Sequence, residues 1–306
     1  PQYPVIQLTQ LVADSTCNGM NPNGTISALV DGVANDTLYT YDWFEVDPVS
    51  GARISGSLSN NDTIMGLAAG RYEVEVTGVS TGCVSTAQRT VINAPIDVRI
   101  LSMSGIDPTS CDPPNGIIEV VSITPGVLSD YTFTFYLRDP GNGGVQVQTA
   151  LGPAFASASS GTYYVEAMHN VYGCTNNLNE IVLGDNLTYP DIDLISFNNQ
   201  TNCGPGNPNG EISAMADGST DNTAYTFEWR DASNTVVEPN NATVSNIPAG
   251  TFTLNVTDNS TGCMSSAMFD IIDDYPDPIR LVISTSSNTN CTNPNGEVSA
   301  TIRNLQ

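Results

Sequence analysis

The chain contains no lysine and a single histidine, and its eight arginines face 32 acidic residues, so that the formal net charge is −24. Because a protein neutralises phosphate groups with a basic stripe, this composition excludes nucleic acid as a partner. It also argues against binding to anionic membrane surfaces. Without lysine the chain forms no Lys–Asn isopeptide crosslink and offers no lysine nucleophile.

Long apolar runs are missing as well. No stretch of about 18 apolar residues and no signal-peptide pattern occurs, so we expect no direct membrane insertion by this chain. The glycine patterns of nucleophile elbows, P-loops and dinucleotide-binding turns are absent too. The one imidazole, His169, lies in an alternating segment and is expected to be a surface strand residue. We therefore expect no enzymatic activity, no catalytic residue and no firmly bound cofactor.

The chain does contain a repeated motif, in which a cysteine is followed a few residues later by Asn-Gly. The first cysteines are Cys17, Cys111, Cys203 and Cys291, and their spacing is 94, 92 and 88 residues. About 60 residues after each of the first three comes a second cysteine, which ends a short Gly-Cys motif: Cys83, Cys174 and Cys263. A fixed period of this kind indicates a tandem array of one module.

The period and the proline-bearing linkers predict the domain boundaries. We expect repeats at residues 1–95, 96–189 and 190–277, and the incomplete start of a fourth at 278–306. Two strands do not form a core alone. The chain is therefore expected to be part of a longer protein.

Within a repeat the apolar residues alternate with polar ones. Tyr72, Val74 and Val76, for example, alternate with Glu73 and Glu75. This period of two indicates strands with one buried face, and no segment of ten residues has a helical pattern. With roughly seven short strands per repeat, the sequence predicts an all-β protein of tandem immunoglobulin-like β-sandwich modules, arranged as beads on a string. The recurring aromatic residues Trp43, Phe135 and Trp229 are predicted to fill the cores, and a surface platform for sugar stacking is the alternative.

Cysteines that recur in pairs indicate disulfides in an oxidising compartment, so we expect an extracellular, cell-surface location. Our preferred pairing is within each repeat: Cys17–Cys83, Cys111–Cys174 and Cys203–Cys263, with the partner of Cys291 beyond the fragment. The alternative joins Cys83–Cys111, Cys174–Cys203 and Cys263–Cys291. A count of seven up-and-down strands conflicts with the preferred pairing, because it places the two cysteines of a repeat at opposite ends of the sandwich.

Carboxylates gather in several loops. Hard oxygen ligands in flexible loops suit Ca²⁺, and ions between modules would stiffen an array. The candidate calcium ligands are Asp31, Asp36, Asp217 and Asp221, and ordinary solvated turn residues are the alternative. With one histidine in the chain, a metal site built on imidazole is not expected.

The first repeat contains Asn23-Gly-x-Ile-Ser, then Tyr39-Thr-Tyr-x-Trp, Leu67-x-Ala-Gly-x-Tyr-x-Val-x-Val and finally Thr81-Gly-Cys. This resembles the SprB-type repeat of the large gliding-motility adhesins of Bacteroidota, although Asn-Gly replaces the usual Asp-Gly and the second repeat lacks the tryptophan. The resemblance covers all three full repeats and implies a cell-surface adhesin exported by type IX secretion. It also implies O-glycans at Asp-Ser/Thr sequences, for which the candidates are Ser15, Thr37 and Thr63.

The function that we expect is therefore that of a structural stalk in a long secreted adhesin, used in gliding motility or surface attachment. Its expected partners are neighbouring repeats of the same chain. Two alternatives are kept. One is a subunit of a self-assembling extracellular filament or surface layer, and the other is a module that binds surface polysaccharide.

Overall fold

The computed structural model describes residues 3–17, 19, 21–33, 37–150, 152–203, 206–275 and 279–304, and this part of the chain is all-β. Its strands pair in antiparallel sheets, and the helical segments are two single 3₁₀ turns, Leu128–Asp130 and Pro140–Asn142. Neither turn, nor any other described segment, forms a helix with the length and apolar character needed to cross a membrane.

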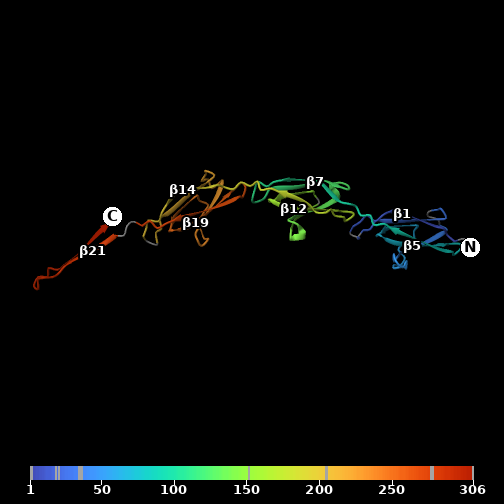
Figure 1. Cartoon of the computed structure of the whole chain (residues 1–306), viewed down its shortest axis with the longest axis horizontal. Helices are drawn as coiled ribbons and strands as arrows, with labels where there is room; N and C mark the ends of the chain where they lie inside the picture. Colours follow the sequence, from blue (N-terminus) through green and yellow to red (C-terminus); the bar gives the residue numbers. More distant parts are fainter. Residues whose placement is uncertain are drawn as a thin grey trace. The chain divides into compact units, whose positions relative to one another are not determined.

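Three immunoglobulin-like β-sandwiches follow one another along the sequence (Figure 1). In each, the first two strands and the strand that precedes the last two form one sheet, and the remaining strands form the other. The first sandwich contains β1 (Ile6–Val12), β2 (Gly24–Val30) and β4 (Thr63–Leu67), facing β3 (Tyr39–Val46), β5 (Gly70–Gly78) and β6 (Val84–Val91).

The second and third sandwiches each have one more strand, at the edge of the second sheet. The second contains β7 (Arg99–Ile106), β8 (Gly116–Thr124) and β11 (Ala154–Ala158), facing β9 (Tyr131–Leu137), β10 (Val145–Ala150), β12 (Gly161–His169) and β13 (Asn179–Leu183). The third contains β14 (Ile192–Asn198), β15 (Gly210–Ala216) and β18 (Thr243–Ile247), facing β16 (Tyr225–Arg230), β17 (Val236–Pro239), β19 (Gly250–Asp258) and β20 (Met264–Ile271). Strands β21 (Ile279–Ser286) and β22 (Glu297–Asn304) form a separate hairpin.

Each sandwich has its own core, and the recurring aromatic residue is at its centre. Trp43, Phe135 and Trp229 are all 0% exposed, which confirms the prediction that they fill the cores. The two indoles also donate hydrogen bonds, Trp43 to the carbonyl oxygen of Asn61 at 2.8 Å and Trp229 to that of Asn241 at 3.0 Å. A ring that is sealed in the core offers no face to a sugar.

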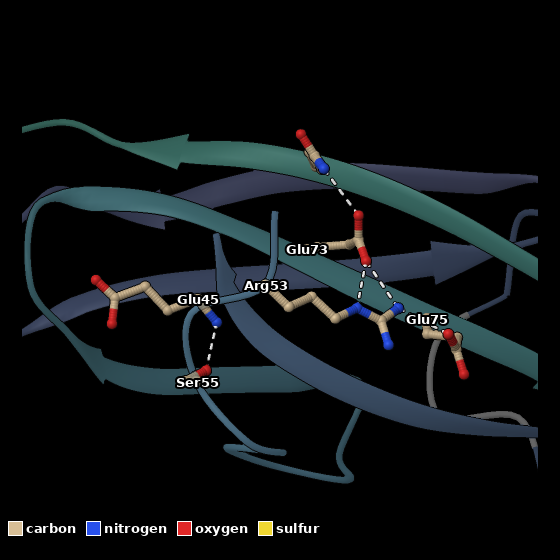
Figure 2. Close-up of polar contacts among 6 residues, drawn as sticks. Glu45, Arg53, Ser55, Glu73 and Glu75 are labelled. Atoms are coloured by element: carbon tan, nitrogen blue, oxygen red, sulfur yellow. Dashed lines mark hydrogen bonds and ion pairs between the residues drawn. The ribbon is translucent and has the colours of Figure 1, made fainter. Parts of the chain in front are cut away.

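The first sandwich lacks the extra edge strand, and side chains hold the corresponding segment in place. Residue 53 makes only an isolated bridge with Val46 at the end of β3. Figure 2 shows the Arg53 guanidinium between Glu73 and Glu75 of β5, at 2.7 Å from each carboxylate. The same guanidinium lies 3.8 Å above the Phe44 ring, so stacking and ion pairing add to the backbone hydrogen bonds that Ile54 and Leu58 donate to β3.

The strand order places the two cysteines of a repeat at opposite ends of the sandwich. The segment after β1 pairs in parallel with the segment after β6, through a bridge between Asp14 and Asn93. Cys17 therefore lies at the end where β6 finishes, whereas Cys83 lies where β6 begins. The length of β6 is about 25 Å at the usual strand rise, but a disulfide requires Cα atoms within about 7 Å.

The chain divides into two compact units, which differ from the predicted repeats. Unit 1 consists of Pro1–Pro108 and Gly116–Asp185, and so contains both of the first two sandwiches. Unit 2 consists of Asn186–Gln306 together with the short segment Thr109–Asn115. The loop between β7 and β8 thus belongs to unit 2, although the strands on either side of it belong to unit 1. The predicted linker at 276–278 lies outside the described residues.

The buried indole of Trp229 provides a test of core packing. Trp229→Phe removes the hydrogen bond to Asn241 and leaves a void, so we expect the third sandwich to lose about 1 to 3 kcal/mol of unfolding free energy. In urea, circular dichroism should show an earlier transition. The fluorescence of Trp43, then the only tryptophan, should follow an unchanged transition of the first sandwich. An earlier Trp43 transition would contradict this assignment of the indole to an independent core.

Candidate functional site: two disulfide clasps

Two loop types carry all seven cysteines. We call the loop between the first two strands of a repeat the Asn-Gly loop; its described examples lie within residues 13–23, 107–115, 199–209 and 287–296. We call the turn before the last strand the Gly-Cys turn; it ends at Cys83, Cys174 or Cys263. In the described structure, each disulfide joins a cysteine of one type to a cysteine of the other type.

The disulfides connect successive repeats. Cys17 is bonded to Cys174, with Cα atoms 4.9 Å apart and a sequence separation of 157. Cys111 is bonded to Cys263, also with 4.9 Å between Cα atoms and a separation of 152. The Asn-Gly loop of one repeat is therefore joined to the Gly-Cys turn of the next, once within unit 1 and once within unit 2.

Our predicted pairing within repeats was wrong. Cys17–Cys83, Cys111–Cys174 and Cys203–Cys263 do not form, because the cysteines of one repeat lie at opposite ends of the sandwich. The alternative of Cys83–Cys111, Cys174–Cys203 and Cys263–Cys291 is excluded by the same bonds. The strand count had already indicated this conflict. The predicted external partner of Cys291 stays a prediction.

Backbone hydrogen bonds accompany each disulfide. In unit 1, the Cys17 N–H donates to the carbonyl oxygen of Tyr172 at 2.9 Å, and the Ile96 N–H donates to that of Ser15 at 3.4 Å. In unit 2, the N–H groups of Cys111 and Asp112 donate to the carbonyl oxygen of Thr261, at 2.8 and 3.2 Å. In both units, the N–H of the loop cysteine donates to the carbonyl of the residue two positions before the Gly-Cys cysteine. We call each such set of a disulfide and its hydrogen bonds a clasp.

The Ser110 hydroxyl adds a third bond in unit 2, donating to the same Thr261 carbonyl at 2.7 Å. The loop packs closely on the turn, because a Cβ atom added to Gly262 would lie 2.2 Å from the Asp112 carbonyl oxygen. Gly262 also has a φ of 68°, a conformation that favours glycine. The glycine of the motif therefore serves both the shape of the turn and the fit of its partner.

The asparagine of the Asn-Gly motif fixes the cysteine loop. In the second repeat the Asn115 side chain accepts from the Thr109 N–H at 2.8 Å and donates to the Thr109 hydroxyl at 3.0 Å. The same two bonds link Asn209 to Thr201, and Asn295 to Thr289. In the first repeat Asn23 holds Ser15 in this way. This Ser or Thr is two residues before the cysteine in each case, so the same two hydrogen bonds fix the chain next to the cysteine in all four loops.

The residue three positions before the cysteine anchors the loop to the sandwich. Asp14 is 5% exposed, and its carboxylate accepts from the Thr16 hydroxyl at 2.8 Å and from the Ala69 N–H at 3.0 Å. Burial alone would raise the pKa of Asp14, but the hydrogen bonds from Thr16 and Ala69 outweigh it and lower the pKa. Gln200, 4% exposed, occupies the equivalent place in the third repeat.

The three candidate calcium ligands that the structure describes, Asp31, Asp217 and Asp221, accept hydrogen bonds within turns. Asp31 accepts from the Val5 N–H at 3.1 Å and from the Tyr39 hydroxyl. Asp217 accepts in the same way from Asp191 and Tyr225. Asp221 caps its own turn through Thr223, and Asp36 lies outside the described residues. In the part of the chain that the structure describes, no three His, Cys, Asp or Glu side chains lie close enough to hold a metal ion.

These contacts give a structural role to a tyrosine that recurs in all three repeats and that was not predicted from the sequence. Tyr39, Tyr131 and Tyr225 stand at the start of the third strand and tie it to the preceding turn, with Tyr131 donating to the Pro125 carbonyl oxygen. The hydrogen bonds from Tyr39 and Val5 lower the pKa of Asp31. The regular spacing between Asp-Gly and tyrosine in the first and third repeats was the signal for this contact.

The three candidate O-glycosylation residues differ in exposure. Thr37 is exposed, whereas Ser15 and Thr63 are half-buried and hydrogen-bonded, to Asn23 and Ser27 respectively. Glycosylation at these three residues stays a prediction. The expectation that His169 lies on the surface was wrong: it is 7% exposed, because its ring packs between Tyr131 and Tyr172 beside the Gly-Cys turn.

No family model and no curated protein matches this sequence. Solved structures that align with it are tandem-domain proteins of low identity. They include three N-terminal domains of the bacteriophage RB49 Highly Immunogenic Outer Capsid protein (10% identity, 89% of this chain and 99% of that chain, TM-score 0.28). Domains 7 to 9 of the S-layer protein SbsC align at 8% identity (81% and 88% covered, TM-score 0.34). The four N-terminal immunoglobulin domains of Dscam1 isoform 4.4 align at 9% identity (99% and 87% covered, TM-score 0.22).

The disulfides themselves indicate the compartment. Structural disulfides form and persist where the environment is oxidising, and are rare in reducing compartments. This chain is therefore typical of a secreted or surface protein.

The pKa of Asp14 leads to a prediction for the first repeat. The folded pKa lies below the unfolded value of about 3.9, so the carboxylate stabilises the fold above that pH and loses its effect as the pH falls through the folded pKa. Asp14→Asn should cost about 1 to 3 kcal/mol at pH 7, because the neutral amide accepts more weakly from Thr16 and Ala69. The difference from wild type should shrink below about pH 4.

Fluorescence of Trp43 in a Trp229→Phe background would report on the first repeat alone. Urea unfolding at pH 7 and at pH 3 measures the difference in unfolding free energy between the chain with Asp14 and the Asp14→Asn variant at each pH. A matched Trp43→Phe variant, in which the remaining Trp229 reports on the third repeat with Gln200 in place of the carboxyl group, provides the non-titrating control. A penalty for Asp14→Asn that stays constant from pH 7 to pH 3 would refute the role given to the charge.

Proposed function

We propose that this chain is a section of a secreted cell-surface stalk whose tandem repeats are covalently interlocked, so that the stalk resists both stretching and cleavage. The observation that carries the proposal is the offset of the disulfides by one repeat, Cys17–Cys174 and Cys111–Cys263. A disulfide within each repeat would strengthen single modules, whereas this offset joins each module to the next.

The offset gives the chain three covalent paths in parallel. Between the two disulfides run the segments 17–111, 111–174 and 174–263. A single cut in any of them leaves the ends of the protein connected through the other two. The shortest path, from residue 111 to residue 174, has 174 − 111 = 63 residues and limits the distance between the disulfides to about 220 Å. The reduced chain from residue 17 to residue 263 would extend to about 860 Å.

The finer assignment rests on the sequence motifs. Their resemblance to the SprB-type repeat supports a role in a large adhesin for gliding motility or surface attachment, exported by type IX secretion. The net charge of −24 suits an extracellular polymer, since like charges oppose aggregation. In the described residues no observation favours polysaccharide binding, because the recurrent aromatic residues considered for it are in the cores.

A cut between the units tests the interlocking. We would insert a site for a specific protease between Asp185 and Asn186, where unit 1 ends and unit 2 begins. After cleavage the oxidised chain should run as one species on a non-reducing gel and separate into two on reduction. In Cys111→Ser the same cut should separate the fragments without reductant. In Cys17→Ser they should stay together, because Cys111–Cys263 alone spans the cut.

The same cut chain tests the mechanical role. Pulled by its termini, it should carry force until reductant is added, and its maximum extension should equal that of the uncut oxidised chain. Fragments that separate without reductant would contradict the offset pairing. On intact cells, external protease should release the chain only when reductant is also present. A chain that stays protected until the cells are lysed would contradict the surface location.

A further inference from the structure

In the first sandwich, the outer face of the second sheet holds a guanidinium (Figure 2). The Arg53 guanidinium lies 3.8 Å above the Phe44 ring and 2.7 Å from each of two carboxylates, those of Glu73 and Glu75. Phe44 belongs to β3 and both glutamates belong to β5, so two paired strands supply the ring and the carboxylates. A planar guanidinium stacks on an aromatic ring while its N–H groups bind carboxylates. This face is therefore a built arginine site.

The buried residues of the sheet identify the equivalent positions in the second sandwich. Trp43 of β3 pairs with Val74 of β5, and Phe135 of β9 pairs with Val165 of β12. All four side chains are 0% exposed. Because successive side chains of a strand point to opposite faces, the residues next to these four point to the outer face. The two outer faces can therefore be compared position by position.

The outer face of the second sandwich keeps an aromatic ring and carries two carboxylates. The equivalent positions are Tyr136 for Phe44, Tyr164 for Glu73, Glu166 for Glu75 and Glu180 for Gln88. We call Tyr136, Tyr164, Glu166 and Glu180 together the tyrosine face. Tyr136 pairs directly with Tyr164, which in turn pairs with Glu180. The four residues thus lie on three adjacent strands, β9, β12 and β13.

Hydrogen bonds hold the carboxylates beside the rings. The Tyr136 hydroxyl donates to Glu166 at 3.3 Å, and the Tyr164 hydroxyl donates to Glu180 at 2.7 Å. Burial and the nearby charge of Glu166 raise the pKa of Tyr136, so this ring stays neutral at pH 7. Both tyrosines are half-buried and Glu180 is exposed. A carboxylate that accepts one hydrogen bond has further lone pairs for the N–H groups of a cation.

No described arginine neutralises the tyrosine face. The ion pairs of the described residues include neither Glu166 nor Glu180. Arg138, directly after β9, is exposed and forms no ion pair with a described residue. In the third sandwich, Arg230 stands at the position of Tyr136 and pairs with a carboxylate on its own strand. The first and third sandwiches thus carry a guanidinium of their own on this face, whereas the second, among the residues described, presents the ring and carboxylates alone.

We propose that the tyrosine face binds an arginine side chain of a partner protein, with the guanidinium stacked on Tyr136 and its N–H groups bound by Glu166 and Glu180. Arg53 makes the same kind of contact within the chain. The net charge of −24 attracts a basic segment and repels a second copy of this chain, so the occupant is a basic protein. The inference goes beyond the proposed function, because it holds whether or not the repeats are interlocked.

The test titrates the intact oxidised chain with N-acetylarginine amide, and with N-acetyllysine amide as a probe of equal charge. NMR spectra of labelled tyrosine rings report the contact, with the signals assigned in Tyr136→Phe and Tyr164→Phe. We expect arginine amide to shift both ring signals and to bind about two- to five-fold more tightly than lysine amide, because only the guanidinium stacks as a plane on the ring. Raising the salt concentration should weaken the binding of both probes.

Charge-matched variants separate the tyrosine face from the general acidity of the chain. Tyr136→Leu keeps every charge but removes the ring, so it should weaken the binding of arginine amide about two- to five-fold and abolish the preference over lysine amide. Glu166→Gln/Glu180→Gln should weaken the binding of both probes. Asp193→Asn/Asp270→Asn removes two charges from exposed positions of the third sandwich, and should leave the shifts of the tyrosine rings unchanged. Circular dichroism checks that each variant is folded.

The arginine site of the first sandwich, once vacated, provides the positive control. Arg53→Ala should let arginine amide reach the Phe44 ring and shift its signal, which shows that the probe enters a site of this kind. Tyrosine rings that do not shift while Phe44 does, or that do not shift at all, would overturn the proposal. So would equal affinity for the two probes, or unchanged binding in Tyr136→Leu. Ring signals that shift as the protein itself is concentrated would assign the face to a second copy and also overturn it.

Discussion

The end-to-end separation of the two cysteines in one sandwich is the constraint on which the whole arrangement depends. Seven strands in the second and third repeats, and six strands with an irregular segment at the place of the missing one in the first, carry the chain back and forth. The loop after the first strand and the turn before the last strand therefore lie at opposite ends. The parallel bridges of Asp14 with Asn93, and of Gln200 with Asp273, fix this relation in the first and third repeats. No rotamer closes a gap of a full strand length, so the four bonded cysteines have their partners outside their own repeats.

The clasp also depends on a loop and a turn that hold their cysteines in fixed positions. A cysteine at the tip of a mobile loop would lose conformational entropy on bonding. Here the asparagine side chain fixes the loop on one side, and the glycine with positive φ shapes the turn on the other. The buried anchors Asp14 and Gln200 then tie the loop to the last strand of the sandwich. Asp14 and the segment that follows β6 are joined by two backbone hydrogen bonds, which connect the loop of the bonded Cys17 to its sandwich.

Much of the fold could be predicted from the sequence, because alternation and period are local signals. Tyr72, Val74 and Val76 are buried as their spacing indicates, and the core aromatics follow the repeat. The disulfide partners could not be read in this way, since pairing depends on which ends of two sandwiches meet. A count of seven up-and-down strands does predict that the two cysteines of a repeat lie far apart. The preferred pairing within a repeat conflicts with that count. The burial of His169 depends on two tyrosines distant in sequence, so its own strand pattern did not reveal it.

The polarity of the clasps follows from the same end-to-end separation of the two cysteines in a repeat. Each repeat presents an Asn-Gly loop at one end and a Gly-Cys turn at the other, so clasps of the observed kind have a polarity and cannot close symmetrically between two ends of the same type. The surface charge acts differently, because a net charge of −24 opposes close approach between chains in every orientation and is weakened by salt. A covalent clasp between matched ends is insensitive to salt. The covalent joints between successive repeats therefore do not depend on salt concentration, whereas the repulsion between chains does.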